Sequence, residues 1–349
     1  MLVSDAKAIA HQWVMEQATQ LPGFQGAFYH GSSNWLADDD ILPATSDLDV
    51  MVVLADANPP EKPGKLIYRD VMLEVSYLAA DQLQSAEQVL GQYHMAGSFR
   101  RPGIIADPSG RLTQLQEAVS REYAKRTWVY RRCEDARNKV LRNLESLDES
   151  APFHDQVMTW LFATGVTTHV LLVAGLKNPT VRKRYVAVRE LLMEYERLDF
   201  YEPLLALLGC AQMSREQVEE HLAALTRIFD YAKTVIKTPF FFAADISDLA
   251  RPIAIDGSRE LIEQGLHREA IFWMVATYCR CQKVLDHDAP EQQAQFEPGF
   301  RRLVADLGIT SLADLQHRRE ETRAFLPHVW EVAQAILAAN PAIEDEPKR

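Results

Sequence analysis

Cysteine is scarce in this chain, and its spacing does not indicate a metal site. There are four cysteines in 349 residues, and no two of them form a Cys-x-x-Cys pair. Structural zinc sites are commonly built from such pairs, so the sequence gives no indication of zinc. Because no secretion signal is recognisable, we expect the thiols to be reduced and the protein to be cytoplasmic.

Long apolar runs are also absent. No run of about 18 apolar residues, the length that spans a membrane, occurs anywhere in the chain. The first twenty residues include Asp5, Lys7 and Glu16 among their apolar positions, unlike the apolar region of a signal peptide. The sequence therefore predicts no membrane partner.

Positive charge is in deficit. The chain has 37 Lys and Arg against 49 Asp and Glu, and its formal net charge is −12. Nucleic-acid binding depends on dense Lys and Arg that release counterions, so the balance disfavours a nucleic-acid partner. An acidic cleft would still attract a small cationic substrate.

Two kinds of pattern divide the chain. As far as Gly110, short apolar segments alternate with Gly, Pro and Asp turns, which is typical of strands, and helical periodicity is confined to two segments. After Gly110, every segment has helical periodicity. We predict an α+β fold, with a small mixed-sheet domain at 1–118 followed by an all-α helical bundle domain at 119–349. The predicted strands are 26–30, 47–54, 65–68, 71–78 and 103–106, and the predicted helices are 4–20, 80–93, 111–147, 153–175, 180–196, 200–209, 214–237, 258–286, 299–307 and 311–338.

Three carboxylates occupy predicted strands of the first domain. Asp47 and Asp49 alternate with apolar residues, so their side chains are expected on one face of a strand. Glu74 lies in a further apolar stretch, within reach of the pair if the strands are neighbours. Neighbouring carboxylates repel each other, and a divalent cation such as Mg²⁺ relieves that repulsion.

A small-residue turn precedes these carboxylates. The apolar segment 28–30 leads directly into Gly31, Ser32 and Ser33. Glycine allows the backbone to approach a phosphate closely, and the amides and hydroxyls that follow can donate to phosphate oxygens. Ser33 could equally be a plain helix cap.

Together these features carry a resemblance. The order apolar-Gly-Ser, a gap, Asp-apolar-Asp and a later apolar-Glu-apolar resembles the DNA polymerase beta nucleotidyltransferase superfamily. A small catalytic domain followed by a helical domain is similar to the antibiotic (aminoglycoside-type) nucleotidyltransferases. The motifs cover residues 28–78, and the order of elements extends the resemblance to about residue 118. The helical half is similar in architecture only, and the loop 34–46 is longer than is usual in the superfamily.

The resemblance implies a two-domain, Mg²⁺-dependent transferase. Such an enzyme transfers a nucleoside monophosphate, AMP from ATP or the equivalent from another NTP, to a hydroxyl of a small polar acceptor and releases pyrophosphate. By the same resemblance, Gly31, Ser32 and Ser33 bind the nucleotide. Asp47 and Asp49 hold two Mg²⁺ ions, and Glu74 is a third metal ligand or the general base.

Two other functions are compatible with the same fold. One is a regulatory module that senses nucleotide without turnover, and the other is a protein-nucleotidylating component of a toxin–antitoxin pair. The three carboxylates also have a structural explanation, in which Asp47 caps a strand, Asp49 is a solvated edge residue and Glu74 faces water. The acceptor, the nucleobase and the oligomeric state, with a homodimer as one option, are open.

Other polar and aromatic residues have simpler structural explanations. His30 fits a half-buried structural histidine, and Asp107 belongs to an Asp-Pro-Ser-Gly turn. Arg280 and His287 have a spacing similar to that of a family of helical ribonucleases, but a two-residue match is best explained by chance. The aromatic run 240–242 fits core packing. A solvated helix start explains the basic cluster of Lys177, Arg182, Lys183 and Arg184. A charged outer face of a helix explains Glu190, Glu194 and Glu196.

Overall fold

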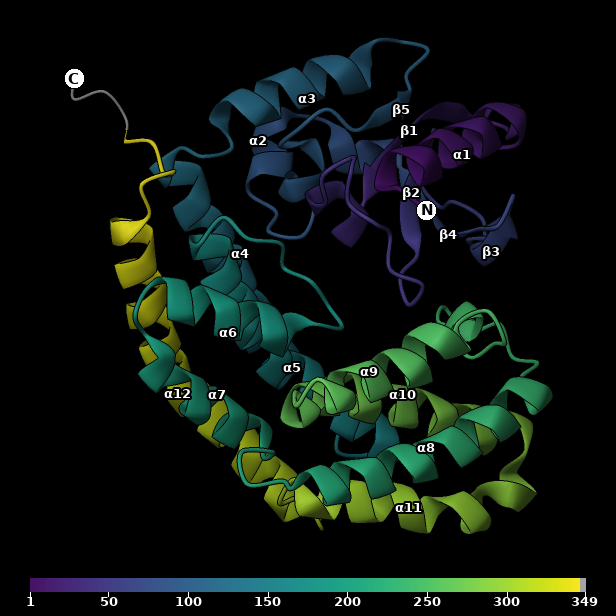
Figure 1. Ribbon diagram of the computed structural model, residues 1–349, viewed down its shortest axis with the longest axis vertical. Helices are drawn as coiled ribbons and strands as arrows, with labels where there is room; N and C mark the ends of the chain where they lie inside the picture. Colours follow the sequence, from purple (N-terminus) through teal and green to yellow (C-terminus); the bar gives the residue numbers. More distant parts are fainter. Residues whose placement is uncertain (346–349) are drawn as a thin grey trace. The chain divides into compact units, whose positions relative to one another are not determined.

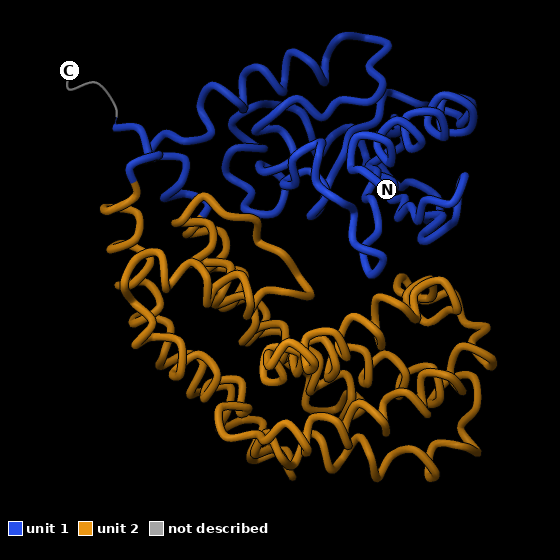
Figure 2. Tube along the Cα trace, in the orientation of Figure 1, with its two compact units in different colours: residues 1–132, 341–349 blue, residues 133–340 orange. Residues whose placement is uncertain are grey.

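Among residues 1–345, which the computed structural model describes, one five-stranded mixed sheet and twelve α-helices form an α+β protein (Figure 1). The α+β prediction is confirmed at this level. The chain divides into two units (Figure 2). Unit 1 consists of residues 1–132 and the segment that begins at Pro341, and unit 2 consists of residues 133–340. All five strands belong to unit 1.

The first turns of α4 (Arg126–Glu145) belong to unit 1 because of their side-chain contacts. Trp128 packs against buried apolar residues of unit 1. The buried Arg132 donates to the carbonyl oxygens of Leu90 at 3.3 Å and Tyr123 at 2.6 Å. The division between the units therefore follows residue 132, whereas the boundary predicted from the sequence lies at residue 118.

The C-terminal segment returns to unit 1. The amide of Arg126 donates to the carbonyl oxygen of Glu344 at 2.9 Å, and the amide of Glu344 donates to the carbonyl oxygen of Ala124 at 3.0 Å. The chain leaves the helical conformation at this pairing, so α3 (Arg111–Glu122) and α4 are separate helices. The prediction of one helix over 111–147 is wrong because this contact joins residues far apart in the sequence.

The sheet of unit 1 has the strand order β3-β4-β2-β1-β5. β2 and β4 are parallel, and the other neighbouring strands are antiparallel. β2 therefore lies at the centre of the sheet, where both of its edges are hydrogen-bonded. The strands are β1 (Phe24–His30), β2 (Leu48–Leu54), β3 (Gly64–Tyr68), β4 (Val71–Ala79) and β5 (Ile104–Ala106).

A two-residue hairpin joins β3 to β4. Its central residues, Arg69 and Asp70, both have positive φ angles, of 47° and 67°. Positive φ at both central positions is the property of a type I′ turn, whose twist matches that of the flanking strands. The predicted strands 65–68 and 71–78 are therefore joined by a hairpin that lacks the glycine such turns favour.

The two faces of the sheet bury different residues. Leu48, Val50 and Val52 pack with the apolar face of α1 (Val3–Glu16). On the other face, Phe28 and Val53 pack with residues of α2 (Ala86–Leu90) and α3. Because side chains alternate along a strand, the odd-numbered residues of β2 share the second face.

Unit 2 is built around α5 (Phe153–Ala174), in which Trp160 is fully buried. This helix packs against α10 and α12, and α8 lies beside α10 and α11 (Figure 1). The other helices of the unit are α6 (Arg184–Glu194), α7 (Tyr201–Leu208), α8 (Arg215–Val235), α9 (Gly257–Glu263), α10 (His267–Asp288), α11 (Gln293–Asp306) and α12 (Leu312–Ala339).

Two predicted helices are interrupted. The segment 258–286 divides into α9 and α10, because Gly265 takes a positive φ of 79° between them. The segment 80–93 contains only a short 3₁₀ turn and the five-residue α2. Ser85 breaks it, since this residue is extended and its hydroxyl accepts from the amide of Gln88 as an N-cap.

One helix in the described chain, α5, is long and apolar enough to cross a membrane. Its most apolar window is 83% buried inside the protein. Burial of this extent is typical of the central helix of a globular unit, and it accounts for the apolar composition without a membrane.

Candidate metal and nucleotide site

Four ionisable residues form a row across one face of the sheet. His30 of β1 lies opposite Asp49 of β2, Asp49 lies opposite Glu74 of β4, and Glu74 lies opposite Lys65 of β3. Residues that are directly opposite each other on neighbouring strands point to the same face. The row thus brings a histidine, two carboxylates and a lysine together.

Asp47 adds a third carboxylate. It immediately precedes β2, and the burial of Leu48 and Val50 on the α1 side directs Asp47 and Asp49 to the opposite face. One carboxylate oxygen each from Asp47, Asp49 and Glu74 lies within 4.8 Å of the other two. The structure therefore groups the three carboxylates that the sequence singled out.

The positions of Asp49 and Glu74 do not fit the explanation in which Asp49 is a solvated edge residue and Glu74 faces water. Asp49 lies on the central strand β2 and not at an edge of the sheet. All three residues are half-buried, so none of them is a fully solvated surface group.

Two lysines contact the carboxylates. The ammonium of Lys65 donates to Asp47 Oδ2 and to Glu74 Oε2, and its side chain is only 5% exposed. Lys62 Nζ donates to the other oxygen of Glu74, Oε1, at 3.0 Å. Charge-assisted bonds of this kind compensate part of the repulsion among the carboxylates.

The lysines act unequally on the three acids. Burial by itself would raise the pKa of Glu74. The positive charges of Lys65 and Lys62 outweigh this effect and lower the pKa to about 2. Burial raises the pKa of Asp49 well above its usual range, and the neighbouring Asp47 and Glu74 raise it further. Burial also raises the pKa of Asp47, against the opposing effect of Lys65. Burial is thus the main reason for the raised pKa of Asp49, and Lys65 and Lys62 offset only part of it.

Gly31 is in close contact with Asp49. It has φ 64° and ψ −157°, and a Cβ atom built on it would lie 1.8 Å from Asp49 Oδ2. This conformation is almost restricted to glycine, and the contact leaves no room for a side chain. The turn after β1 therefore needs glycine for the carboxylate to occupy its place.

The two serines after Gly31 have different surroundings. Both belong to a 3₁₀ turn, Ser32–Trp35. Ser33 is fully buried, and its hydroxyl points inward to the carbonyl oxygen of His30 at 3.4 Å. Ser32 is half-buried, so it is the more accessible of the two serines.

His30 makes a short hydrogen bond of 2.6 Å between its Nδ1 and the hydroxyl of Ser98. Burial lowers the pKa of His30 to about 4, and the nearby His94 adds to the effect. The ring is therefore neutral at neutral pH. A neutral, hydrogen-bonded ring is consistent with the structural role expected for His30. The position of His30 opposite Asp49 was not evident from the sequence.

A second basic residue lies next to the turn. The guanidinium of Arg100 stacks on the indole of Trp35 at 3.6 Å. Gly97 lies under the same indole, where a Cβ atom would be 2.9 Å from the ring. The side-chain amide of Asn34 donates to the carbonyl oxygen of Ser98 at 3.2 Å, which ties the turn to the segment 96–100.

Lys62, Lys65 and Arg100 are the charged residues that the sequence analysis missed. A lysine near a predicted strand is too common to be informative by itself. The signal lies in the register of the β3–β4 hairpin, which places Lys65 opposite Glu74. That register becomes evident only when the two-residue turn between the strands is recognised.

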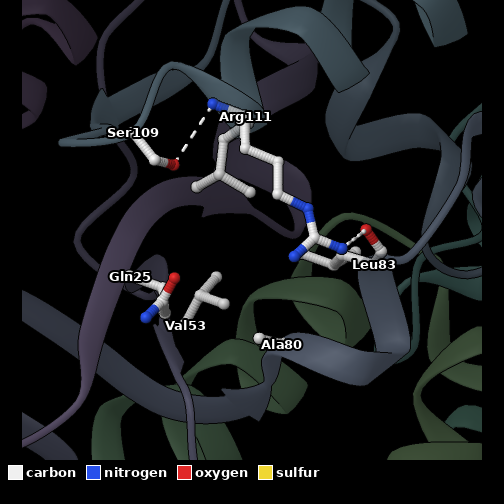
Figure 3. Close-up of a pocket in the computed structure, with 7 residues that line it drawn as sticks. Gln25, Val53, Ala80, Leu83, Ser109 and Arg111 are labelled. Carbon is white, nitrogen blue, oxygen red and sulfur yellow. Dashed lines mark hydrogen bonds between the residues drawn. The ribbon is translucent and has the colours of Figure 1, made fainter.

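The pocket shown in Figure 3 lies elsewhere in unit 1. Val53, Leu83 and Arg111 line it, and the guanidinium of Arg111 donates to the carbonyl oxygen of Leu83 at 3.3 Å. Val53 follows Asp49 by four residues on β2, or about 13 Å along the strand. This small pocket is therefore separate from the carboxylates.

The weaker sequence candidates have structural partners. Asp107 accepts from the amide and the hydroxyl of Thr113 and so holds the start of α3. Arg280 pairs with Asp245 at 2.9 Å, whereas His287 lies near the end of the same helix and its ring meets the edge of Phe240.

The basic cluster of unit 2 is not a uniformly solvated helix start. Arg184 is fully buried, with its guanidinium 3.7 Å from the ring of Phe272. Lys177 pairs with Glu194 at 2.7 Å on the surface. The aromatic run pairs within itself, since the rings of Phe240 and Phe242 are stacked. None of these contacts, all within unit 2, brings a second group of carboxylates together.

The donor set of unit 1 suits a hard divalent cation. Mg²⁺ prefers carboxylate oxygens, and three are available here with an ammonium already bound among them. No protein-family model matches the chain, and no curated protein matches it at a significant level. The case for a function therefore rests on the site itself.

Proposed function

We propose that this protein is a Mg²⁺-dependent nucleotidyltransferase. It transfers a nucleoside monophosphate, AMP from ATP, to a hydroxyl of a small polar acceptor and releases pyrophosphate. The observation that supports the proposal is the grouping of Asp47, Asp49 and Glu74 within 4.8 Å beside the Gly31 turn. The order in which the same residues occur in the sequence resembles that of the DNA polymerase beta superfamily, which is consistent with the proposal.

In this proposal Asp47, Asp49 and Glu74 hold the metal. When bound, Mg²⁺ supplies positive charge that neutralises the triphosphate and the developing charge on pyrophosphate. The backbone of Gly31 and the hydroxyl of Ser32 hold phosphate oxygens at the turn.

The transfer forms one bond and breaks one bond. The acceptor oxygen bonds to the α-phosphorus, the bond from that phosphorus to the bridging oxygen of pyrophosphate breaks, and the hydroxyl proton is released to solvent. Because Lys62 and Lys65 hold the pKa of Glu74 at about 2, Glu74 is a weak proton acceptor. We therefore assign it the role of ligand and not of general base.

The composition of the chain bears on the kind of acceptor. The net charge of −12 favours a small, cationic or neutral acceptor such as an aminoglycoside over a polynucleotide. We propose a cytoplasmic location, where ATP and Mg²⁺ are both available.

Pyrophosphate release tests this function. The full chain is incubated with ATP, Mg²⁺ and a panel of small hydroxyl acceptors that includes aminoglycosides. The Asp47→Asn and Asp49→Asn variants are expected to lose about 100-fold or more of the rate, because each weakens the hold on the Mg²⁺ that would neutralise the charge developing on pyrophosphate. The matched control is Asp56→Asn, which changes an exposed aspartate after the other end of β2 and should leave the rate unchanged.

A second candidate is a nucleotide-sensing module without turnover. The observation that favours it is the contact of Lys65 with two of the carboxylates, which compensates their charge without a metal. Binding of ATP that depends on Asp49, with no pyrophosphate released for any acceptor in the panel, would support the sensor and contradict the transferase.

A further inference from the structure

Lys65 occupies the space between two of the three carboxylates. Its ammonium donates to Asp47 Oδ2 and Glu74 Oε2 from a side chain that is almost completely buried. Lys62 holds the remaining oxygen of Glu74. Both oxygens of Glu74 and one oxygen of Asp47 are therefore already bonded to ammonium groups.

The contacts around Asp49 are different. Within residues 1–345, neither lysine donates a hydrogen bond to Asp49, although the three carboxylates lie within 4.8 Å. The Gly31 backbone lies against one of its oxygens, as the 1.8 Å approach of a hypothetical Cβ shows. The carboxylate oxygens that accept no hydrogen bond from Lys62 or Lys65 are therefore both oxygens of Asp49 and the second oxygen of Asp47.

A count of formal charges also favours a single cation at this site. Two divalent cations on three bare carboxylates give the same net charge as one divalent cation on three carboxylates and two lysines. A second divalent cation beside the lysines would add two further positive charges in a half-buried place. The lysines therefore reduce the electrostatic need for a second cation.

Backbone register fixes Lys65 in this place. Lys65 lies directly opposite Glu74 in the β3–β4 hairpin, and its buried stem runs over the sheet. The backbone of a lysine on a flexible loop can move away from the carboxylates when a metal ion binds. The backbone of Lys65 is held by the hydrogen bonds of the β3–β4 pair. The pairing of β3 with β4 therefore keeps the ammonium of Lys65 within reach of Asp47 and Glu74.

We propose that the ammonium of Lys65 takes the place of a second metal ion, so that unit 1 binds a single divalent cation, on Asp47 and Asp49. The inference rests on the metal site of the proposed function. It replaces the two Mg²⁺ ions expected from the resemblance with one, and it changes Glu74 from a metal ligand to a partner of Lys62 and Lys65. Lys65 is a positioning residue in this arrangement, because it acts through Asp47 and Glu74.

Manganese binding to the full chain tests the inference without any turnover. Free Mn²⁺ is measured by its electron paramagnetic resonance signal during titration of the wild type and of Lys65→Met, which keeps the unbranched stem and removes the charge. We expect one Mn²⁺ per wild-type chain and two per Lys65→Met chain. The matched control is Lys62→Met, which removes the more exposed lysine and should still bind one.

A second readout is the melting temperature. Loss of the buried ammonium leaves three carboxylates facing one another, so Lys65→Met should be less stable than the wild type without metal. Saturating Mn²⁺ should then raise its melting temperature more than that of the wild type, since two bound ions stabilise more than one. Circular dichroism at the starting temperature shows whether the variant is folded.

Each outcome decides one of the two proposals. Two Mn²⁺ ions on the wild type, or a single ion on folded Lys65→Met, would overturn the inference, while metal-dependent pyrophosphate release would still support the transferase. No Mn²⁺ on any variant would overturn both. If Lys65→Met does not fold, the stoichiometry of the wild type alone still decides between one ion and two.

Discussion

The Cα of Gly31 approaches Asp49 so closely that a Cβ atom at position 31 would lie 1.8 Å from Oδ2 of that carboxylate. Gly31 directly follows β1 and Asp49 lies on β2, and the antiparallel pairing of these two strands brings the residues together. The position of the carboxylate therefore depends on the absence of a side chain in the preceding turn.

Substitution of this glycine should affect both stability and metal binding. Gly31→Ala places a side chain in a φ/ψ region that is almost restricted to glycine, at a cost of about 2 kcal/mol, and displaces Asp49. We expect a lower free energy of unfolding in urea and weaker Mn²⁺ binding.

Gly110→Ala is the control for this substitution. Gly110 also has a positive φ, of 74°, but no atoms would contact its Cβ. It should lose about 1 kcal/mol of stability and bind Mn²⁺ normally. Equal Mn²⁺ affinity in Gly31→Ala and the wild type would contradict the role assigned to the contact.

The β3–β4 turn offers a stabilising substitution. Asp70 holds a φ of 67° at the second central position of a type I′ turn, where glycine is strongly preferred. Asp70→Gly should therefore increase the free energy of unfolding by about 0.5–1 kcal/mol. Urea denaturation of the full chain measures the change.

Arg69→Gly separates the turn from its side-chain contacts. Arg69 also has positive φ, but its guanidinium donates to Gln12 at 2.6 Å and to Glu16 at 3.1 Å. The loss of these bonds should offset the relief of strain, so this variant should gain less than Asp70→Gly. A larger gain from Arg69→Gly would show that the contacts are not formed in solution.

The start of α12 should make stability depend on pH. Hydrogen bonds from Thr310 and Ser311 hold the pKa of Asp314 at about 2, below its usual value of 3.8. A carboxylate whose pKa is lowered on folding stabilises the protein above its unfolded pKa, and this contribution is lost as the pH falls from about 4 to about 2.

Asp314→Ala tests that dependence. The variant should melt at a lower temperature than the wild type at pH 7, because the capping bonds with Ser311 are lost. The difference between the two melting temperatures should be smaller at pH 3. An unchanged difference at the two pH values would mean that the charge of Asp314 does not contribute.

Much of unit 1 could be predicted because its signals are local. The alternation of Asp47 and Asp49 with Leu48 and Val50 indicates a strand with one buried face, and the structure buries both apolar residues. Glu74 alternates in the same way with buried Leu73 and Val75, which indicates a strand, whereas its place beside the aspartates depends on the pairing of β2 with β4.

What could not be predicted depends on contacts between distant residues. The place of Lys65 requires the register of a hairpin whose turn lacks glycine. The break between α3 and α4 requires the pairing of Glu344 with residues near 125, more than half of the chain away. Local periodicity contains no information on either contact.

The return of residues 341–345 to unit 1 has a consequence for synthesis. Ribosomes make a chain from its N-terminus, so the sheet is complete long before Glu344 emerges, and the whole helical unit is translated in between. The carbonyl of Ala124 and the amide of Arg126 therefore acquire their bonds to Glu344 only after the helical unit has been translated.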